Sequence, residues 1–130
     1  MEQGYLIDTC AVIKYLSVVY PAKGLKFLDT VVDSESIPSF ISVIELLAWN
    51  PANANDLLIY SKFIDGSRII MMDAAIINQA VSIRKKAKLK IPDSIIAATA
   101  IVNGLTLISD NDRDFKKVEG LKYLNPMAIR

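Results

Sequence analysis

The feature that most constrains the fold is an alternation of short apolar runs with longer segments of helical spacing. The first apolar run, residues 5–8, ends in a carboxylate, and a helical pattern over about residues 10–17 follows at once. Further runs of strand type lie at residues 36–40, 68–72, 105–109 and, weakly, 123–124. Helical patterns separate these runs, as crossovers between parallel strands require. The sequence therefore predicts an α/β fold, a three-layer α/β/α sandwich with a mostly parallel sheet of four to five strands.

The length and composition fit one compact unit. A chain of 130 residues with 52% hydrophobic content can bury one full core, so we expect a single domain over residues 1–130. The longest apolar run, residues 95–102, is far shorter than the roughly 18 residues of a membrane-spanning helix. The first residues lack the basic region of a signal peptide. We therefore expect a soluble, cytoplasmic protein with no membrane partner.

The lack of histidine and the presence of a single cysteine limit the kinds of catalytic and metal site that the chain can form. The chain has no histidine, which excludes a Ser-His-Asp triad, a histidine general base and a histidine-ligated zinc site. It has one cysteine, Cys10, so neither a disulfide nor a cysteine cluster can form within the chain. We interpret Cys10 as a small core residue. The remaining reactive groups are carboxylates, hydroxyls, lysines and arginines, and oxygen ligands of this kind suit Mg²⁺ or Mn²⁺.

Acidic residues stand at several predicted strand and helix ends. Asp8 ends the first strand, where it could equally cap the next helix. Glu45 completes an S-x-x-E capping-box pattern that begins at Ser42, yet it lies inside an apolar run. Asp93 lies in the first turn of an almost wholly apolar helix, a common place for an acid. Residues 110–114 hold three acids directly after a strand, either as a solvated loop or as ligands.

Taken together, these acids should meet at the sheet edge where parallel strands end, which is where ligands bind in open α/β sheets. Carboxylates that crowd one crevice raise each other's pKa unless a cation offsets their charge. The sequence therefore predicts a divalent-metal site at this edge.

A basic segment lies elsewhere in the chain, although the net charge is only +1. Residues 84–90 hold five cations and no anion: Arg84, Lys85, Lys86, Lys88 and Lys90. Such a run can grip an RNA backbone without regard to sequence. It can equally be a solvated helix end, where cations are favourable.

With these residues in hand, the chain resembles the PIN-domain ribonucleases, particularly the VapC-type toxins of toxin–antitoxin pairs. Four segments resemble the family's motifs in order and spacing: Tyr5-Leu6-Ile7-Asp8-Thr9, Ser42-Val43-Ile44-Glu45-Leu46, Pro92-Asp93-Ser94-Ile95-Ile96-Ala97-Ala98-Thr99-Ala100, and Asn103-Gly104-Leu105-Thr106-Leu107-Ile108-Ser109. Asp114-Phe115, Gly120-Leu121 and Asn125-Pro126 resemble its C-terminal end. The resemblance covers nearly the whole chain and implies a PIN-like fold.

The resemblance also implies the site and the partners. It makes Asp8, Glu45 and Asp93 the first three catalytic and metal-binding acids. The fourth falls on Asp112 when the chain is aligned back from Asp114-Phe115, or on Asn111 when it is aligned from the strand. We choose Asp112, with Asp114 as a supporting acid. RNA as substrate, a small antitoxin protein that blocks the site, and a homodimer are implied as well.

The predicted activity is an Mg²⁺- or Mn²⁺-dependent endoribonuclease. Asp8 and Asp93 would be the chief metal ligands, with Glu45 and Asp112 holding a second metal or orienting water. Thr9 or Ser109 would hydrogen-bond a phosphate oxygen or a ligating carboxylate.

Two alternatives stay open at this point. A phosphoryl-transfer enzyme of the haloacid-dehalogenase kind would carry D-x-D at the first strand tip, whereas Asp8 is followed by Thr9 and Cys10. A non-catalytic RNA- or protein-binding module on a PIN-like fold is the second alternative.

Overall fold

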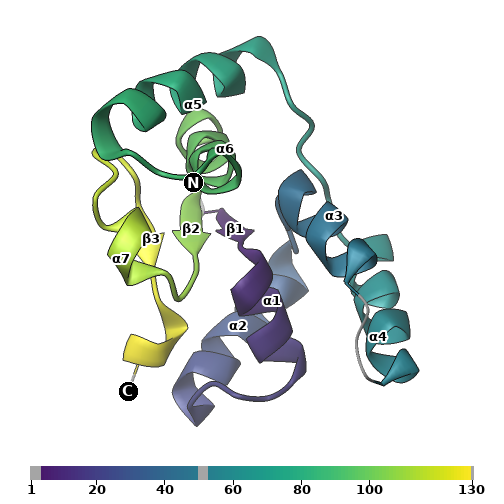
Figure 1. The fold of residues 1–130 in the computed structure, drawn as a ribbon. Coiled ribbons are helices and arrows are strands. Elements are labelled where there is room, and N and C mark those ends of the chain that lie inside the picture. Colours follow the sequence, from purple (N-terminus) through teal and green to yellow (C-terminus); the bar gives the residue numbers. More distant parts are fainter. Residues whose placement is uncertain (1–3, 50–52, 130) are drawn as a thin grey trace.

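The computed structural model describes residues 4–49 and 53–129 (Figure 1). Seven α-helices are present in these ranges: α1 (Thr9–Leu16), α2 (Ala22–Ser34), α3 (Phe40–Ala48), α4 (Ala54–Asp65), α5 (Ala74–Ala87), α6 (Ile91–Val102) and α7 (Asp112–Phe115). The strands are β1 (Tyr5–Ile7), β2 (Thr106–Ile108) and β3 (Tyr123–Leu124), and a 3₁₀ turn, η1 (Pro126–Ala128), follows them. The predicted α/β fold class is confirmed.

The three strands form one parallel sheet in the order β1-β2-β3. Tyr5 pairs with Thr106 and Ile7 with Ile108 between β1 and β2, and Leu107 pairs with Tyr123 between β2 and β3. The carboxyl ends of β1 and β2 therefore stop level with each other. Asp8 and Ser109, the residues that follow them, are neighbours across the strand ends.

Two predicted strands are shorter than expected. Residues 36–40 and 68–72 contribute only single parallel bridges, Ile7 with Pro38 and Ser39 with Ile70, on the other side of β1. Proline has no backbone N–H to give to a ladder. Ser39 then accepts a hydrogen bond from the backbone N–H of Ile41 and caps α3, which turns the chain out of the sheet.

This geometry also corrects the predicted start of α3. The helix begins at Phe40 with Ser39 as its cap, so Ser42 lies inside the helix and the predicted capping box does not form. At α1, by contrast, Asp8 is the cap residue, as one interpretation of the sequence expected.

The core lies on both faces of the sheet because neighbouring strand residues point to opposite sides. Leu6 and Leu107 belong to an apolar cluster with α5 and α6, and Ile7 and Ile108 belong to a second cluster with α1 to α4. Figure 1 shows α5 and α6 at the top of the view and α1 and α2 below the sheet. Within the described ranges, no helix is both long enough and apolar enough to cross a membrane.

Candidate active site

Asp8 lies where β1 ends and α1 begins. Its Oδ1 atom accepts a hydrogen bond from the backbone N–H of Thr9 at 2.8 Å, and its Oδ2 atom accepts one from Ser109 Oγ at 2.9 Å. The residue is 7% exposed. Burial raises the pKa of Asp8 to about 6; the bonds from Ser109 and Thr9 lower it, and the charges of Asp93 and Glu45 raise it further.

Glu45 reaches the same region from α3. Thr9 Oγ1 donates a hydrogen bond to Glu45 Oε1 at 2.7 Å and also lies 2.8 Å from Ser42 Oγ. The side chain of Glu45 is therefore tied to the start of α1, next to Asp8, rather than to the start of its own helix. Thr9, predicted to hydrogen-bond a phosphate oxygen or a ligating carboxylate, donates here to the carboxylate of Glu45.

Asp93 is placed by the first turn of α6. Burial raises the pKa of Asp93, and the charges of Asp114 and Glu45 raise it further, whereas Lys90 lowers it. The negative charges of Glu45 on α3 and Asp114 on α7 thus act on Asp93, and the charge of Asp93 acts in turn on Asp8. Four carboxylates from four elements, Asp8, Glu45, Asp93 and Asp114, are linked in this way.

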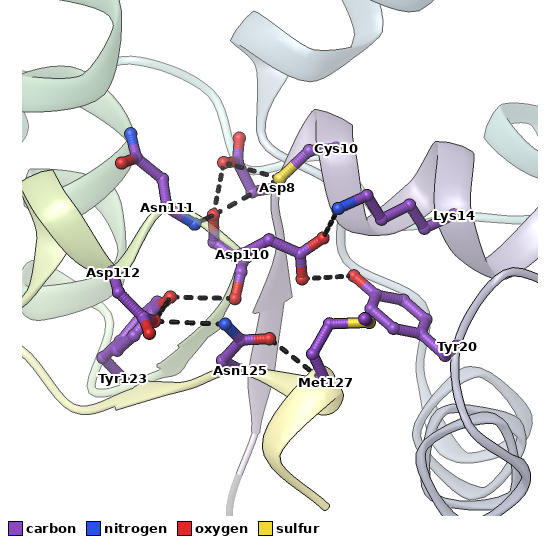
Figure 2. Close-up of polar contacts among 11 residues, drawn as sticks. Asp8, Cys10, Lys14, Tyr20, Asp110, Asn111, Asp112, Tyr123, Asn125 and Met127 are labelled. Atoms are coloured by element: carbon purple, nitrogen blue, oxygen red, sulfur yellow. Dashed lines mark hydrogen bonds and ion pairs between the residues drawn. The ribbon is translucent and has the colours of Figure 1, made fainter.

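Asp112, the predicted fourth acid, is hydrogen-bonded to residues outside this group. Its Oδ1 atom accepts hydrogen bonds from Tyr123 Oη at 2.5 Å and from Asn125 Nδ2 at 3.1 Å, and Lys116 Nζ lies 3.6 Å from its Oδ2 atom. Hydrogen bonding from Tyr123 and Asn125 lowers the pKa of Asp112. Figure 2 shows Asp112 beside Tyr123 and Asn125, away from Asp8. Its partners anchor the loop after β2 to β3.

Asn111, the alternative to Asp112 as the fourth site residue, is hydrogen-bonded to Asp114. Asn111 Nδ2 donates to Asp114 Oδ2 at 3.0 Å, and Asn111 Oδ1 accepts from the backbone N–H of Asp114 at 3.3 Å. The backbone N–H of Asn111 donates to Ser109 Oγ at 3.2 Å. Ser109 thereby joins Asp8 to the loop that carries Asp114.

The structure adds two residues that the sequence did not single out for the site. Asp110 Oδ1 accepts from Tyr20 Oη at 2.7 Å, and Lys14 Nζ lies 2.5 Å from Asp110 Oδ2 (Figure 2). Cys10 Sγ lies 3.4 Å from Ser109 Oγ and 3.7 Å from an oxygen of Asp8. Burial raises the pKa of the Cys10 thiol, which disfavours the thiolate. No local pattern marks contacts between segments so far apart in the sequence.

Comparison with known proteins identifies the family. The PIN domain family model matches residues 5–121 of this chain. The chain belongs to the PIN-domain family. PIN domains are generally nucleases, and the family resemblance seen in the sequence is thereby confirmed. No curated protein matches the chain significantly.

Solved structures show the same PIN fold. The DNA-bound VapBC structure from Salmonella typhimurium contains a chain that is 19% identical, with a TM-score of 0.80 over 96% of this chain and 99% of that chain. A toxin–antitoxin complex from Klebsiella pneumoniae contains one that is 25% identical, with a TM-score of 0.73 over 95% and 98%. FitAcB from Neisseria gonorrhoeae is 24% identical, with a TM-score of 0.75 over 95% and 99%.

The acids of this PIN domain suit a hard divalent cation by their chemistry. Four carboxylates with no histidine or thiolate among them are the oxygen donors that Mg²⁺ and Mn²⁺ prefer. Burial raises the pKa of Asp8 and the charges of Asp93 and Glu45 add to the shift, a cost that a bound cation would offset. Among residues 4–49 and 53–129, however, no three acidic or other ligand side chains are close enough together to hold a metal ion. The four acids therefore fit a divalent cation by the type of their donor atoms and by their charge.

The basic segment of this PIN domain, residues 84–90, spans the end of α5 and the connection to α6. Arg84 Nη1 donates to the carbonyl of Leu89 at 2.7 Å, and Lys88 ends α5 in a left-handed conformation, with φ 58°. Lys90 precedes α6 and lowers the pKa of Asp93, so the segment ends near the acids.

Proposed function

We propose that this PIN domain is an Mg²⁺- or Mn²⁺-dependent endoribonuclease whose acids are Asp8, Glu45, Asp93 and Asp114. The observation that carries the proposal is the convergence of these acids at the end of the sheet, where the charges of Asp93 and Glu45 act on Asp8 and the charges of Asp114 and Glu45 act on Asp93. Asp114 replaces Asp112 in the proposed set because the charge of Asp114 acts on Asp93. The carboxylate of Asp112 instead accepts hydrogen bonds from Tyr123 and Asn125.

We assign each of the four acids a role according to its position. Asp8 and Asp93 would hold the metal, and Glu45 and Asp114 would complete its surroundings or orient the attacking water. Bound metal would lower the pKa of a water molecule and offset negative charge on the phosphate. Ser109 fixes Asp8 Oδ2, and Thr9 fixes Glu45 Oε1, so both carboxylates are oriented before substrate arrives.

The exposed lysines of the basic segment are proposed to hold the RNA backbone. Lys85, Lys86, Lys88 and Lys90 are exposed, and within the described residues none of them is in an ion pair. Arg84 contributes charge, although its guanidinium is bound to the Leu89 carbonyl. Lysines and arginines that neutralise phosphates make affinity fall steeply with salt.

A small antitoxin protein is the proposed regulatory partner, and the chain is proposed to be the toxin of the pair. Support comes from the structures that share its fold, which include a complex described as toxin–antitoxin. Since such a toxin acts on cellular RNA, we place its activity in the cytoplasm. Co-expression with the protein encoded by an adjacent short reading frame, followed by loss of cleavage, tests this partner.

A homodimer through α5 is the proposed assembly. Ile77 and Val81 lie one helical turn apart on α5 and are 50% and 49% exposed. Asp73 caps the start of the helix and Lys85 lies in its last turn. In an antiparallel pair of α5 helices, Ile77 would pack on Val81 of the second copy, and Asp73 would lie opposite Lys85. Each copy would thus offer an apolar residue to an apolar one and an acid to a base, as the symmetry of a two-fold interface requires.

Cleavage of a mixed RNA pool tests the nuclease directly. The assay is run with Mn²⁺ and with EDTA, on wild type and on Asp8→Asn and Asp93→Asn, because asparagine keeps the shape and removes the ligand charge. Asp33→Asn, an exposed acid on α2, is the matched control. Metal-dependent cleavage that both site variants lose and the control keeps supports the proposal. Cleavage that survives in both site variants contradicts it, and RNA binding without cleavage would favour the non-catalytic module.

A further inference from the structure

An open hollow adjoins the acids on the α3 side. It has a volume of about 440 Å³ and is lined by Thr9, Ile13, Glu45, Ala48 and Trp49. Glu45 and Trp49 are four residues apart at the end of α3, which places them one helical turn apart along the same face. The hollow therefore begins at a proposed catalytic carboxylate and ends at an aromatic ring.

Trp49 is supported from behind by a second ring. Tyr60 of α4 stacks with Trp49, with 5.7 Å between ring centroids and 18° between the planes. Tyr60 is 3% exposed, whereas Trp49 is 45% exposed. Figure 1 shows α3, which Trp49 directly follows, side by side with α4, which carries Tyr60. A large aromatic ring is thus fixed against the core and presented to solvent, the arrangement of a stacking platform.

The charge of the hollow selects what can enter it. Its only charged group among the described lining residues is the carboxylate of Glu45, which accepts a hydrogen bond from Thr9. A phosphate would be repelled at that point, and no lysine or arginine among these lining residues would offset the repulsion. A flat, uncharged nucleobase matches both the ring and the apolar walls made by Ile13 and Ala48.

We propose that Trp49 stacks on a base of single-stranded RNA, next to the phosphate that the acids would cleave. Stacking at this position rests on the proposed nuclease function, since it identifies the part of the substrate that enters beside Glu45. Base stacking on an aromatic side chain tolerates any base, because every base has a π face. Trp49 would therefore position the strand rather than read its sequence.

Trp49 is the only tryptophan in the chain, so intrinsic tryptophan fluorescence reports on this ring alone. The wild-type protein is titrated, in EDTA to prevent cleavage, with a short mixed-sequence single-stranded RNA. The matched probe is a ribose-phosphate oligomer of the same length without bases. We expect the RNA to quench the fluorescence and the abasic oligomer to leave it nearly unchanged. Equal responses to both, or no response to RNA, would overturn the proposal and leave the hollow to a protein partner.

Variants provide a second readout through affinity for a labelled RNA. Trp49→Phe should keep the affinity within a few-fold, and Trp49→Ala should lower it about 5- to 150-fold, the range for loss of one stacked base. Leu58→Ala, an exposed apolar residue on α4, is the control and should bind like wild type. An unchanged affinity in Trp49→Ala would overturn the proposal.

The same measurements separate stacking from catalysis. Because stacking needs no metal, base-dependent quenching should persist in Asp8→Asn. Quenching in a protein that cleaves no RNA would support the stacking and reject the nuclease. Cleavage by a protein whose fluorescence ignores the bases would support the nuclease and reject the stacking.

Discussion

Ser109 Oγ donates a hydrogen bond to Asp8 Oδ2 at 2.9 Å across the ends of two neighbouring strands. The contact follows from the sheet register, because Ile7 and Ile108 are paired and each is followed by one of these residues. The backbone repeats the connection, since the N–H of Asp8 donates to the carbonyl of Ile108 at 2.9 Å. The position of the first acid of the proposed site is thus fixed by strand pairing.

Replacing Ser109 by alanine should move the pH dependence of activity. The Ser109 hydrogen bond favours the charged form of Asp8, so its loss should raise the pKa of Asp8 above about 6. The acidic limb of the pH profile of kcat/KM in Mn²⁺ should then shift toward higher pH. Ser36→Ala removes another buried hydroxyl, one that bonds Ser67 Oγ far from the acids, and should keep the wild-type profile. An identical profile in Ser109→Ala would contradict this role.

Replacing Asp8 by asparagine should stabilise the metal-free protein near neutral pH. The pKa of Asp8 is raised from 3.8 to about 6 in the folded state, so folding is opposed above about pH 6 and the penalty disappears as the pH falls below 3.8. The full penalty corresponds to about 3 kcal/mol as an upper estimate. Urea unfolding in EDTA should therefore show a higher free energy of unfolding for Asp8→Asn at pH 7.5 and little gain near pH 4.

Added Mn²⁺ should reverse the order of stability of wild type and Asp8→Asn. Metal that binds only the folded state raises the melting temperature as its concentration exceeds the dissociation constant. Wild type should gain stability with Mn²⁺ at pH 7.5, whereas Asp8→Asn should respond much less. Asp33→Asn serves as the control in both experiments and should follow wild type. Equal responses to Mn²⁺ in Asp8→Asn and wild type would argue against a metal at Asp8.

The sequence predicted the elements with strong local signals. The apolar run at residues 5–8 and the buried helix that Asp93 opens were both found, because each carries enough apolar surface to need burial. The strands at residues 36–40 and 68–72 were predicted too long. Local β propensity was overruled there by Pro38 and by the competing cap at Ser39.

The different surroundings of the acids after β2 could not be predicted from the sequence. Asp112 and Asp114 are two residues apart in the same loop, and both fit the pattern of a ligand. What separates them is Tyr123 and Asn125, which reach Asp112 from the following strand region. Such a contact depends on the sheet order β1-β2-β3, which is a property of the tertiary structure.

Asparagine substitutions at Asp114 and Asp112 should change different properties: the first should change cleavage and the second should change stability. Asp114→Asn removes a charge that acts on Asp93, so we expect loss of Mn²⁺-dependent cleavage with little change in melting temperature. Asp112→Asn weakens the bonds from Tyr123 and Asn125 that anchor the loop, so we expect a lower melting temperature with cleavage retained at permissive temperature. Loss of cleavage only in Asp112→Asn would restore Asp112 as the fourth acid.

The proposed α5 interface predicts how charge and apolar substitutions should change the assembly. Ile77→Asp places a carboxylate in the centre of the face and should give a monomer in sedimentation experiments. Leu58→Asp changes an equally apolar, 56% exposed residue on α4 and should leave the assembly intact. A monomeric wild type, or an Ile77→Asp protein that still dimerises, would exclude this interface.

Lys85→Glu gives a finer test of the antiparallel arrangement, because it puts a second acid opposite Asp73 of the other copy and should weaken the dimer. Asp73→Asn keeps the hydrogen bond that caps α5, since asparagine accepts from the Ile76 N–H as aspartate does at 2.8 Å. Adding it to Lys85→Glu removes the like-charge repulsion and should recover part of the affinity. Recovery by a change at the opposite end of the helix is expected only if the two α5 helices run antiparallel.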